Sequence, residues 1–264
     1  MLDINHIFKT FNPGTINEKR ALSDLDLHLK TGEFVTVIGG NGAGKSTMLN
    51  AVAGVWPVDS GSVVIDGKDV TGLPEYRRAS LIGRVFQDPM MGTAPDMLLA
   101  ENLALAYRRG RRRGLAWGVT KAERELYREK LRALGLGLED RLTAKAGLLS
   151  GGQRQALTLL MAALQRPRLL LLDEHTAALD PATAAKVLEL SDRVIRENGL
   201  TAMMITHNMK DAITHGNRLI MMNEGRIILD IAGEEKKKLT KAGLLQKFAE
   251  VAGVQEETDE VLLS

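Results

Sequence analysis

A glycine-rich turn between an apolar run and a helix-forming segment constrains this chain more than any other feature. Residues 34–38 read Phe-Val-Thr-Val-Ile, which suits a strand buried on both faces. The turn after it, residues 39–46, reads Gly-Gly-Asn-Gly-Ala-Gly-Lys-Ser and fits the pattern G-x-x-x-x-G-K-[ST]. A helix is expected from about Lys45 until Gly54 ends it. A strand, turn and helix in this order are typical of α/β folds with a mainly parallel sheet.

The turn has the composition of a phosphate-binding loop. Its glycines let the backbone wrap closely, so that successive N–H groups point at phosphate oxygens, and the start of the helix adds a favourable dipole. Lys45 would bring a positive charge to the β- and γ-phosphates, and the Ser46 hydroxyl is an oxygen ligand that suits Mg²⁺. By average residue usage the pattern arises by chance in roughly one chain in a hundred of this size. We predict that ATP is bound by Gly39, Gly40, Asn41, Gly42, Ala43, Gly44, Lys45, Ser46 and Thr47.

Two adjacent carboxylates follow a second apolar run. Residues 169–172 are four leucines, and Asp173 and Glu174 come directly after them. Open α/β sheets bind ligands at the carboxyl ends of their strands, so these side chains are expected beside the glycine-rich turn. An acidic turn after an apolar run is common by itself, and it gains its meaning from the phosphate-binding turn in the same chain. We predict that Asp173 holds Mg²⁺, through water, and that Glu174 orients or deprotonates the attacking water.

A second segment of small residues opens another helix. Residues 149–153 read Leu-Ser-Gly-Gly-Gln, and Ser150 is a good N-cap for a helix that runs to about Gln165. Small residues at a helix start offer N–H groups and a hydroxyl to an anion. A simple capped helix is the alternative explanation, but it does not explain why this segment lies just upstream of the strand that carries Asp173 and Glu174.

The rest of the chain continues the alternation of strands and helices. Leu25, Leu27 and Leu29 alternate with polar residues, which predicts a half-buried strand, and residues 2–10 are expected to pair with it antiparallel. Residues 95–147 show no strand pattern and are expected to form a helical insert, with a charged amphipathic helix at residues 120–134. Further strands are predicted at residues 62–66, 82–87, 201–205, 219–222 and 226–231.

Bulk composition excludes several classes of protein. Lys+Arg 35 against Asp+Glu 33 gives a nearly neutral chain, so no general attraction to nucleic acid is expected. The absence of cysteine excludes disulfides, thiolate metal sites and cysteine nucleophiles. The chain also lacks the run of about 20 apolar residues that a spanning helix needs, and its start does not have the pattern of a secretory signal. We therefore expect that it does not cross a membrane by itself.

These motifs occur in the order found in the ATP-binding cassette (ABC) family, whose nucleotide-binding domain the chain resembles over roughly residues 2–232. The resemblance implies an α/β fold of the P-loop NTPase type. Such a fold has a mainly parallel sheet core, an antiparallel N-terminal β subdomain and a helical insert that carries the Leu-Ser-Gly-Gly-Gln signature. We expect the ATPase domain at residues 1–254, its helical part at about residues 90–165, and an acidic, mobile tail at residues 255–264.

The resemblance also assigns roles to residues that no motif above explains. Gln87 matches the glutamine that senses magnesium and the permease, and would join Ser46 and Asp173 at the metal. His207 matches the switch histidine, which with Lys45 and Glu174 completes the implied catalytic set. Asp180 lies in the loop that crosses the dimer, and Phe11 is the best match to the aromatic ring that stacks on adenine. The signature residues that would bind the ATP of a partner subunit are Ser150, Gly151, Gly152 and Gln153.

A family member of this kind works with other chains. The resemblance implies a head-to-tail homodimer in which the phosphate loop of one copy and the signature of the other enclose each ATP. It also implies an integral membrane permease, an extracytoplasmic solute-binding protein and a position on the cytoplasmic face of the cell membrane. The segments at residues 10–15 and 86–93 resemble uptake systems for amino acids, and aromatic amino acids are our expectation for the solute.

Two features depart from the family pattern or lie outside it. His175 stands where proline is usual, and it is either a local structural variant or an extra polar contact near the γ-phosphate. The arginine-rich stretch from Arg108 to Arg113 is either a solvated loop or a contact with anionic lipid or an acidic permease loop.

Other functions share the same motifs. An ATPase for export or lipoprotein release would have every residue named above, and so would a soluble ABC ATPase such as an assembly factor. Co-purification with a multi-span membrane protein distinguishes the transport subunit from the soluble ATPase. A gene for a solute-binding protein next to this one distinguishes import from export.

Overall fold

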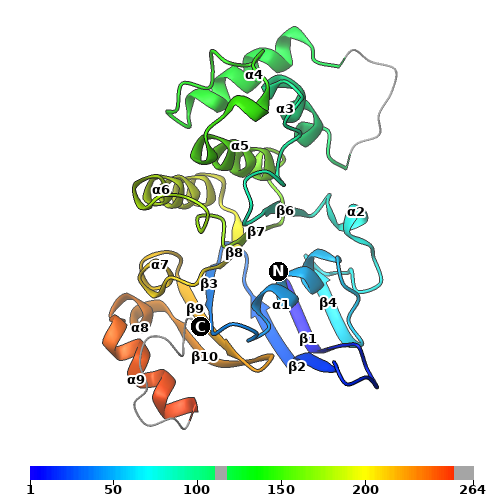
Figure 1. Ribbon diagram of the computed structural model, residues 1–264, viewed down its shortest axis with the longest axis vertical. Coiled ribbons are helices and arrows are strands. Elements are labelled where there is room, and N and C mark those ends of the chain that lie inside the picture. The colour runs from blue at the N-terminus through cyan, green and yellow to red at the C-terminus, as the bar shows by residue number, and fades with distance from the viewer. Residues whose placement is uncertain (111–117, 253–264) are drawn as a thin grey trace.

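The computed structural model describes residues 1–110 and 118–252. Figure 1 shows two β-sheets at one end of the molecule and the helices α3, α4 and α5 at the other. The strands are β1 Leu2–Phe11, β2 Lys19–Leu29, β3 Phe34–Ile38, β4 Ser60–Ile65, β5 Lys68–Asp69, β6 Ile82–Val85, β7 Leu169–Asp173, β8 Thr201–Ile205, β9 Arg218–Asn223 and β10 Arg226–Ala232. The helices are α1 Lys45–Ala53, α2 Glu75–Arg78, α3 Leu99–Tyr107, α4 Lys121–Arg132, α5 Gly151–Ala163, α6 Pro181–Asn198, α7 Met209–Thr214, α8 Gly233–Lys237 and α9 Lys241–Ala252, with a 3₁₀ turn at Ala146–Leu148.

The larger sheet forms the predicted parallel core. Its strand order is β10-β9-β3-β8-β7-β6, and all neighbours from β9 to β6 are parallel, while β10 closes a hairpin with β9. The smaller sheet, β2-β1-β4-β5, is antiparallel throughout. The predicted fold class is therefore confirmed, including the antiparallel N-terminal portion and the helical insert between β6 and β7.

Both faces of the core strands are buried, because successive residues enter different hydrophobic clusters. Leu169 and Leu171 of β7 pack with α1 and the antiparallel sheet, whereas Leu170 and Leu172 pack with α5 and α6. A strand covered on both faces cannot show an alternating pattern, which is why this segment reads as an unbroken apolar run. The packing fixes the carboxyl end of β7 next to the start of α1.

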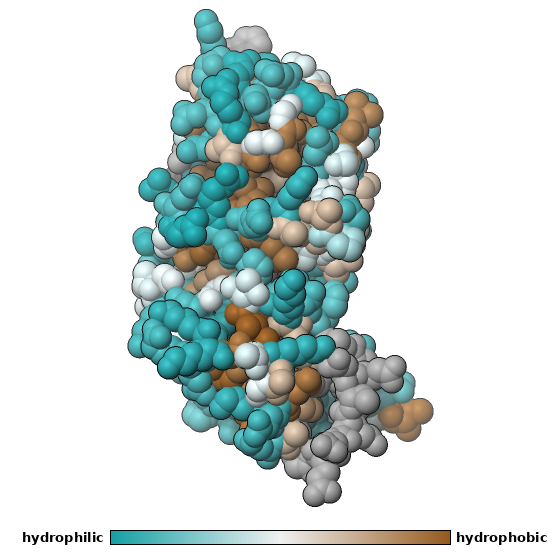
Figure 2. All heavy atoms as spheres, turned by 90° about the vertical axis from the view of Figure 1, so that its left-hand side faces the viewer, coloured by the Kyte–Doolittle hydropathy of each residue, from teal (hydrophilic) through white to brown (hydrophobic). Residues whose placement is uncertain are grey.

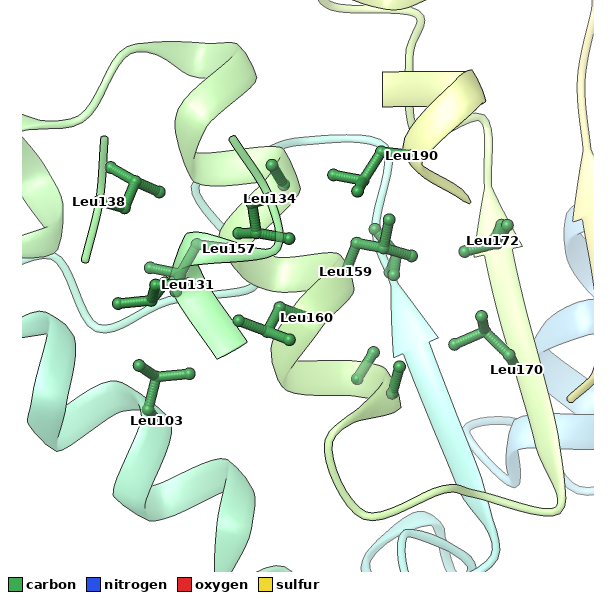
Figure 3. Close-up of a cluster of buried hydrophobic side chains, with 14 of the residues drawn as sticks. Leu103, Leu131, Leu134, Leu138, Leu157, Leu159, Leu160, Leu170, Leu172 and Leu190 are labelled. Atoms are coloured by element: carbon green, nitrogen blue, oxygen red, sulfur yellow. The ribbon is translucent and has the colours of Figure 1, made fainter. Parts of the chain in front are cut away.

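The helical part has its own buried contacts. Leu131 of α4 lies in one cluster with Leu103 of α3 and with Leu157 and Leu160 of α5 (Figure 3). Thr120 caps α4 through a reciprocal pair of hydrogen bonds with Glu123. These contacts bring α3 and α4 onto α5, and they position the start of α5, where the signature lies.

Several boundaries differ from the predicted ones. β6 ends at Val85, so the last two residues of the predicted strand lie in the turn after it. β2 begins at Lys19, earlier than the alternation indicates, because register shifts against β1 and the left-handed backbone of Asp24 (φ 55°) interrupt the pattern. β5 and the helices α2, α7, α8 and α9 were not predicted.

No helix in residues 1–110 or 118–252 combines the length and the apolar character that crossing a membrane requires. The predicted acidic tail at residues 255–264 lies outside the described residues, as do the last three arginines of the arginine-rich stretch. Of that stretch, Arg108 pairs with Glu123 at 2.8 Å and Arg109 donates to the carbonyl of Ala162 at 3.0 Å. These two arginines hold the helical part together.

Candidate active site

The glycine-rich turn connects β3 to α1, and two of its glycines cannot be replaced without moving the backbone around them. Gly39 has φ 149°, and a Cβ there would lie 2.2 Å from the carbonyl oxygen of Met222. Gly44 has φ 98°, and a Cβ there would lie 2.5 Å from the carbonyl oxygen of Ala21. Both backbone conformations favour glycine, and neither position has room for a side chain. The loop is therefore held by close contact with β9 and β2.

The helix after the loop begins without a side-chain cap. Gly44 occupies the N-cap position of α1, and glycine has no side chain that could cap the first turn. The first N–H groups of a helix have no partner within the helix, and they lie at the positive end of its dipole. The start of α1 can therefore donate to an anion without first giving up a capping interaction.

Lys45 lies folded against the loop. Its Nζ donates to the carbonyl oxygens of Gly39 at 2.6 Å and Gly40 at 3.0 Å, and the residue is only 7% exposed. Burial lowers the pKa of Lys45, and the negative charge of Glu174 partly opposes that effect. The ammonium group thus lies at the loop, close enough to Glu174 to be affected by its charge.

A cleft of about 290 Å³ opens over the loop. Phe11 lies at its edge and packs edge-to-face against Trp56, with ring centroids 5.0 Å apart and planes at 83°. The cleft therefore combines an aromatic edge, a cationic loop and a carboxylate. Its lining residues are Phe11, Lys19, Ala21, Asn41, Gly42, Ala43, Gly44, Lys45, Ser46, Thr47 and Glu174.

Glu174 and His207 face each other beside this cleft. Glu174 follows β7 in a left-handed backbone conformation (φ 43°), and its N–H donates to the carbonyl of Ile205 at the end of β8 at 3.1 Å. His207, two residues beyond that strand, places its Nδ1 3.6 Å from Glu174 Oε2. The parallel pairing of β7 with β8 therefore brings together two residues that are far apart in the sequence.

Asp173, the last residue of β7, directly precedes Glu174. Its Oδ2 lies 3.2 Å from a guanidinium nitrogen of Arg84 on β6. Burial raises the pKa of Asp173 despite that guanidinium, and the charge of Glu174 adds to the rise. The carboxylates of Asp173 and Glu174, together with the Ser46 hydroxyl, are an oxygen donor set that suits Mg²⁺.

The structure does not bring every predicted residue into the cleft. Gln87 is exposed in the turn after β6 and does not line the cleft. Ser150, Gly152 and Gln153 line a different hollow, between α5 and α6. Gly151 is exposed in the first turn of α5, and Asp180 caps α6 by accepting a hydrogen bond from the N–H of Thr183 at 3.1 Å.

His175 has a structural role and is not an extra polar contact in the cleft. It is 1% exposed, and its Nε2 lies 2.9 Å from the Ser191 hydroxyl on α6. Burial lowers the pKa of His175 to about 4, and the nearby His215 adds to the effect. His175 therefore joins the loop after β7 to α6 and does not line the cleft.

Two charged residues of the site were not predicted from the sequence. Lys19 lies at the cleft, with its Nζ 3.2 Å from where a Cβ on Gly42 would be, and Arg84 pairs with Asp173. The register of β1 with β2 places Lys19 opposite Phe11, and the order of β6 beside β7 places Arg84. Neither pairing has a sequence signal, because strand order in a sheet is not written in any single segment.

Comparison with known proteins agrees with this geometry. A family model described as ABC transporter matches residues 22–177. The tyrosine transport ATP-binding protein of Clostridioides difficile (strain R20291) is 43% identical over 249 residues, which cover 94% of this chain and 98% of that protein. The spermidine/putrescine import ATP-binding protein PotA of Haemophilus influenzae is 32% identical over 232 residues, 87% of this chain but only 57% of its own length.

Solved structures give the same result. A dimeric ATP-binding cassette, MJ0796, in a post-hydrolysis state bound to ADP and Pi has a TM-score of 0.75 to this chain. It is 30% identical, and the match covers 88% of this chain and 98% of that one.

The fold and the cleft define a P-loop ATPase with an inserted helical part. The chain belongs to the ABC transporter family, and it is an ATP-binding subunit that hydrolyses ATP. The predictions of the family, the fold class and the ATPase activity are thereby confirmed. Cassettes of this family form dimers and work with membrane permease components, and relatives that are import ATPases support the predicted role in solute uptake.

Proposed function

We propose that this subunit drives the uptake of an aromatic amino acid, with tyrosine as the first candidate. The support is the 43% identity to a tyrosine transport ATP-binding protein over nearly the whole of both chains. The ATP-binding subunit itself need not contact the solute. The choice of solute therefore depends on the similarity to the tyrosine transport ATP-binding protein. Deleting the gene should lower uptake of labelled tyrosine, and restoring the wild-type chain should return it. Unchanged uptake of tyrosine, phenylalanine and tryptophan would exclude this solute class.

The chemistry at the cleft is ATP hydrolysis with Glu174 as the residue that orients or deprotonates the attacking water. Its carboxylate lies at the cleft beside Lys45, and His207 Nδ1 is 3.6 Å from it. Lys45 and the open N–H groups of α1 stabilise the charge that develops on the phosphates. Ser46 and Asp173 would hold Mg²⁺, with Gln87 as a further ligand, and the ion would neutralise phosphate charge during transfer.

The observation that supports a dimeric site best is the separation of the two anion-binding helix starts. The start of α1 opens into the cleft, whereas Ser150, Gly152 and Gln153 line another hollow of the same chain. We infer that the signature of a second copy, arranged head to tail, completes each ATP site, and that Phe11 stacks on the adenine. Two equal sites follow from the two-fold symmetry of such a dimer.

The remaining partners are proposed on the same basis. A permease would bind this subunit at the cytoplasmic face of the membrane. An extracytoplasmic solute-binding protein would supply the solute. Tagged subunit should co-purify with a multi-span membrane protein after gentle detergent extraction. Recovery of the ATPase alone, from cells that contain the whole operon, would favour a non-transport ABC ATPase.

A further inference from the structure

A second hollow of about 560 Å³ lies outside the ATP cleft. It is bounded by α6, by the first turns of α5 and by the segment between α4 and α5. Pockets that bind small molecules have volumes of about 300–1,000 Å³, so this hollow has the size of a small-molecule site. Lys45, Glu174 and His207 do not line it, whereas Ser150, Gly152 and Gln153 of the signature do.

The inner wall of the hollow is apolar. Leu134, Ala156, Val187 and Leu190 line it and are buried, with at most 7% exposure. Figure 3 shows Leu134, from the segment after α4, and Leu190, from α6, in the same buried cluster. Figure 2 shows the side of the molecule on which α6 lies in Figure 1, where small apolar areas open between hydrophilic side chains. An apolar body of a ligand could therefore leave water here.

The outer part of the hollow is cationic. Lys186, Arg193 and Arg196 line it on α6, at spacings of seven and three residues that keep them on one face of the helix. Glu189 is the one acidic residue among the lining residues. In the described part of the chain none of the three cations forms a salt bridge, and Arg193 is fixed by donating to the carbonyl of Ala133 at 2.9 Å.

We propose that this hollow binds a small organic anion with an apolar body, and that the bound anion acts as an effector of the ATPase. The apolar wall and the three cations complement an apolar body and a negative head. The lining comes both from the helical part and from α6 of the core, so a ligand there bridges the two. The bridge lies where α5 and α6 touch: a Cβ on Gly152 would be 2.2 Å from Cγ2 of Thr183. Occupancy therefore changes how the signature end of α5 is held.

The test uses 8-anilinonaphthalene-1-sulfonate, a fluorescent apolar anion, and nucleotide-free wild-type protein. Saturable binding is expected, and octanoate should displace the probe better than octylamine, which has the same chain and the opposite charge. Arg196→Gln and Lys186→Gln should each raise the probe's dissociation constant about two- to fivefold, and Glu189→Gln should lower it by a similar factor. Thermal unfolding checks that each variant is folded.

Glu197→Gln is the matched control, because it removes the same charge from the same helix at an exposed position that does not line the hollow. It should leave the dissociation constant unchanged. Octanoate should alter the ATPase rate of the wild-type protein, and Arg196→Gln should need about two- to fivefold more octanoate for the same change. Equal effects of Glu189→Gln and Glu197→Gln, or no saturable binding, would overturn the proposal. The probe-binding measurements contain no nucleotide, so a negative result there does not bear on the proposed ATP chemistry.

Discussion

The starts of α1 and α5 are both rich in small residues, but they present their N–H groups differently. α1 begins at Gly44 without a side-chain cap, whereas α5 begins at Ser150, whose hydroxyl accepts from the N–H of Gln153 while the Gln153 side chain accepts from the N–H of Ser150. The first start is open inside its own chain, and the second is already satisfied. The comparison teaches that the start of α1 can bind an anion as it stands, whereas the start of α5 must first give up its internal hydrogen bonds, as the proposed contact with a partner's nucleotide requires.

The largest effect is expected on ATP turnover, from a variant that still dimerises but cannot hydrolyse ATP. Glu174→Gln keeps the shape of the side chain and removes the charge that orients or deprotonates water, so turnover should fall about 10²–10⁴-fold. ATP binding should remain, and a closed dimer should accumulate because reopening follows hydrolysis. Phosphate release and light scattering measure the two properties. Normal turnover would remove Glu174 from its catalytic role.

Lys45→Ala should affect the first helix start alone. The ammonium group that now bonds to the carbonyl oxygens of Gly39 and Gly40 is lost, and with it a charged contact to phosphate. A hydrogen bond to a charged group contributes about 1.5–3 kcal/mol, so ATP affinity should fall at least about tenfold. Isothermal titration calorimetry on the isolated subunit measures the change. Wild-type affinity would show that the loop binds phosphate through its backbone alone.

Acid should destabilise the fold at the contact between the loop after β7 and α6. His175 ties the loop after β7 to Ser191 of α6, and its pKa in the fold is about 4 against about 6.5 in the unfolded chain. The unfolded chain therefore binds a proton between these values that the folded chain does not, so stability falls as pH is lowered through this range. The loss between pH 7 and pH 5 should be about 1–2 kcal/mol.

Urea unfolding of the wild type and of His175→Asn checks this expectation. Asparagine can still bond to Ser191 but takes up no proton, so the variant should lose less stability between the two pH values. His215, which pairs with Asp192 on the same helix, stays the same in both proteins. Equal pH dependence of the two proteins would show that another group titrates.

The smallest effect is expected at the second helix start. Ser150→Ala removes the capping hydroxyl, which should cost about 1 kcal/mol of unfolding free energy. ATP affinity of the isolated subunit should not change, because Ser150 does not line the cleft of its own chain. Dimer formation in the Glu174→Gln background should nevertheless weaken. A fall in ATP affinity of the monomer would contradict the division of roles between the two helix starts.

The sequence predicts the local parts of this fold well and their neighbours poorly. The cap at Ser150 and the turn before Lys45 are each specified within a few residues, so they could be recognised directly. The contact of Glu174 with His207 follows from the family resemblance, whereas the position of Arg84 depends on strand order. Lys19 reaches the cleft only through the register of two irregular strands. Long-range pairing is set by packing of the whole sheet, and no single segment carries it.

The most direct test of the central claim is a mixing experiment on two variants in the Glu174→Gln background. One also carries Lys45→Ala and the other Ser150→Arg, so that a head-to-tail pair of unlike copies keeps one intact composite site. With saturating Mg-ATP, analytical ultracentrifugation should find more dimer in the mixture than in either variant alone. A mixture with no more dimer than its separate components would contradict a site built from the phosphate loop of one copy and the signature of another.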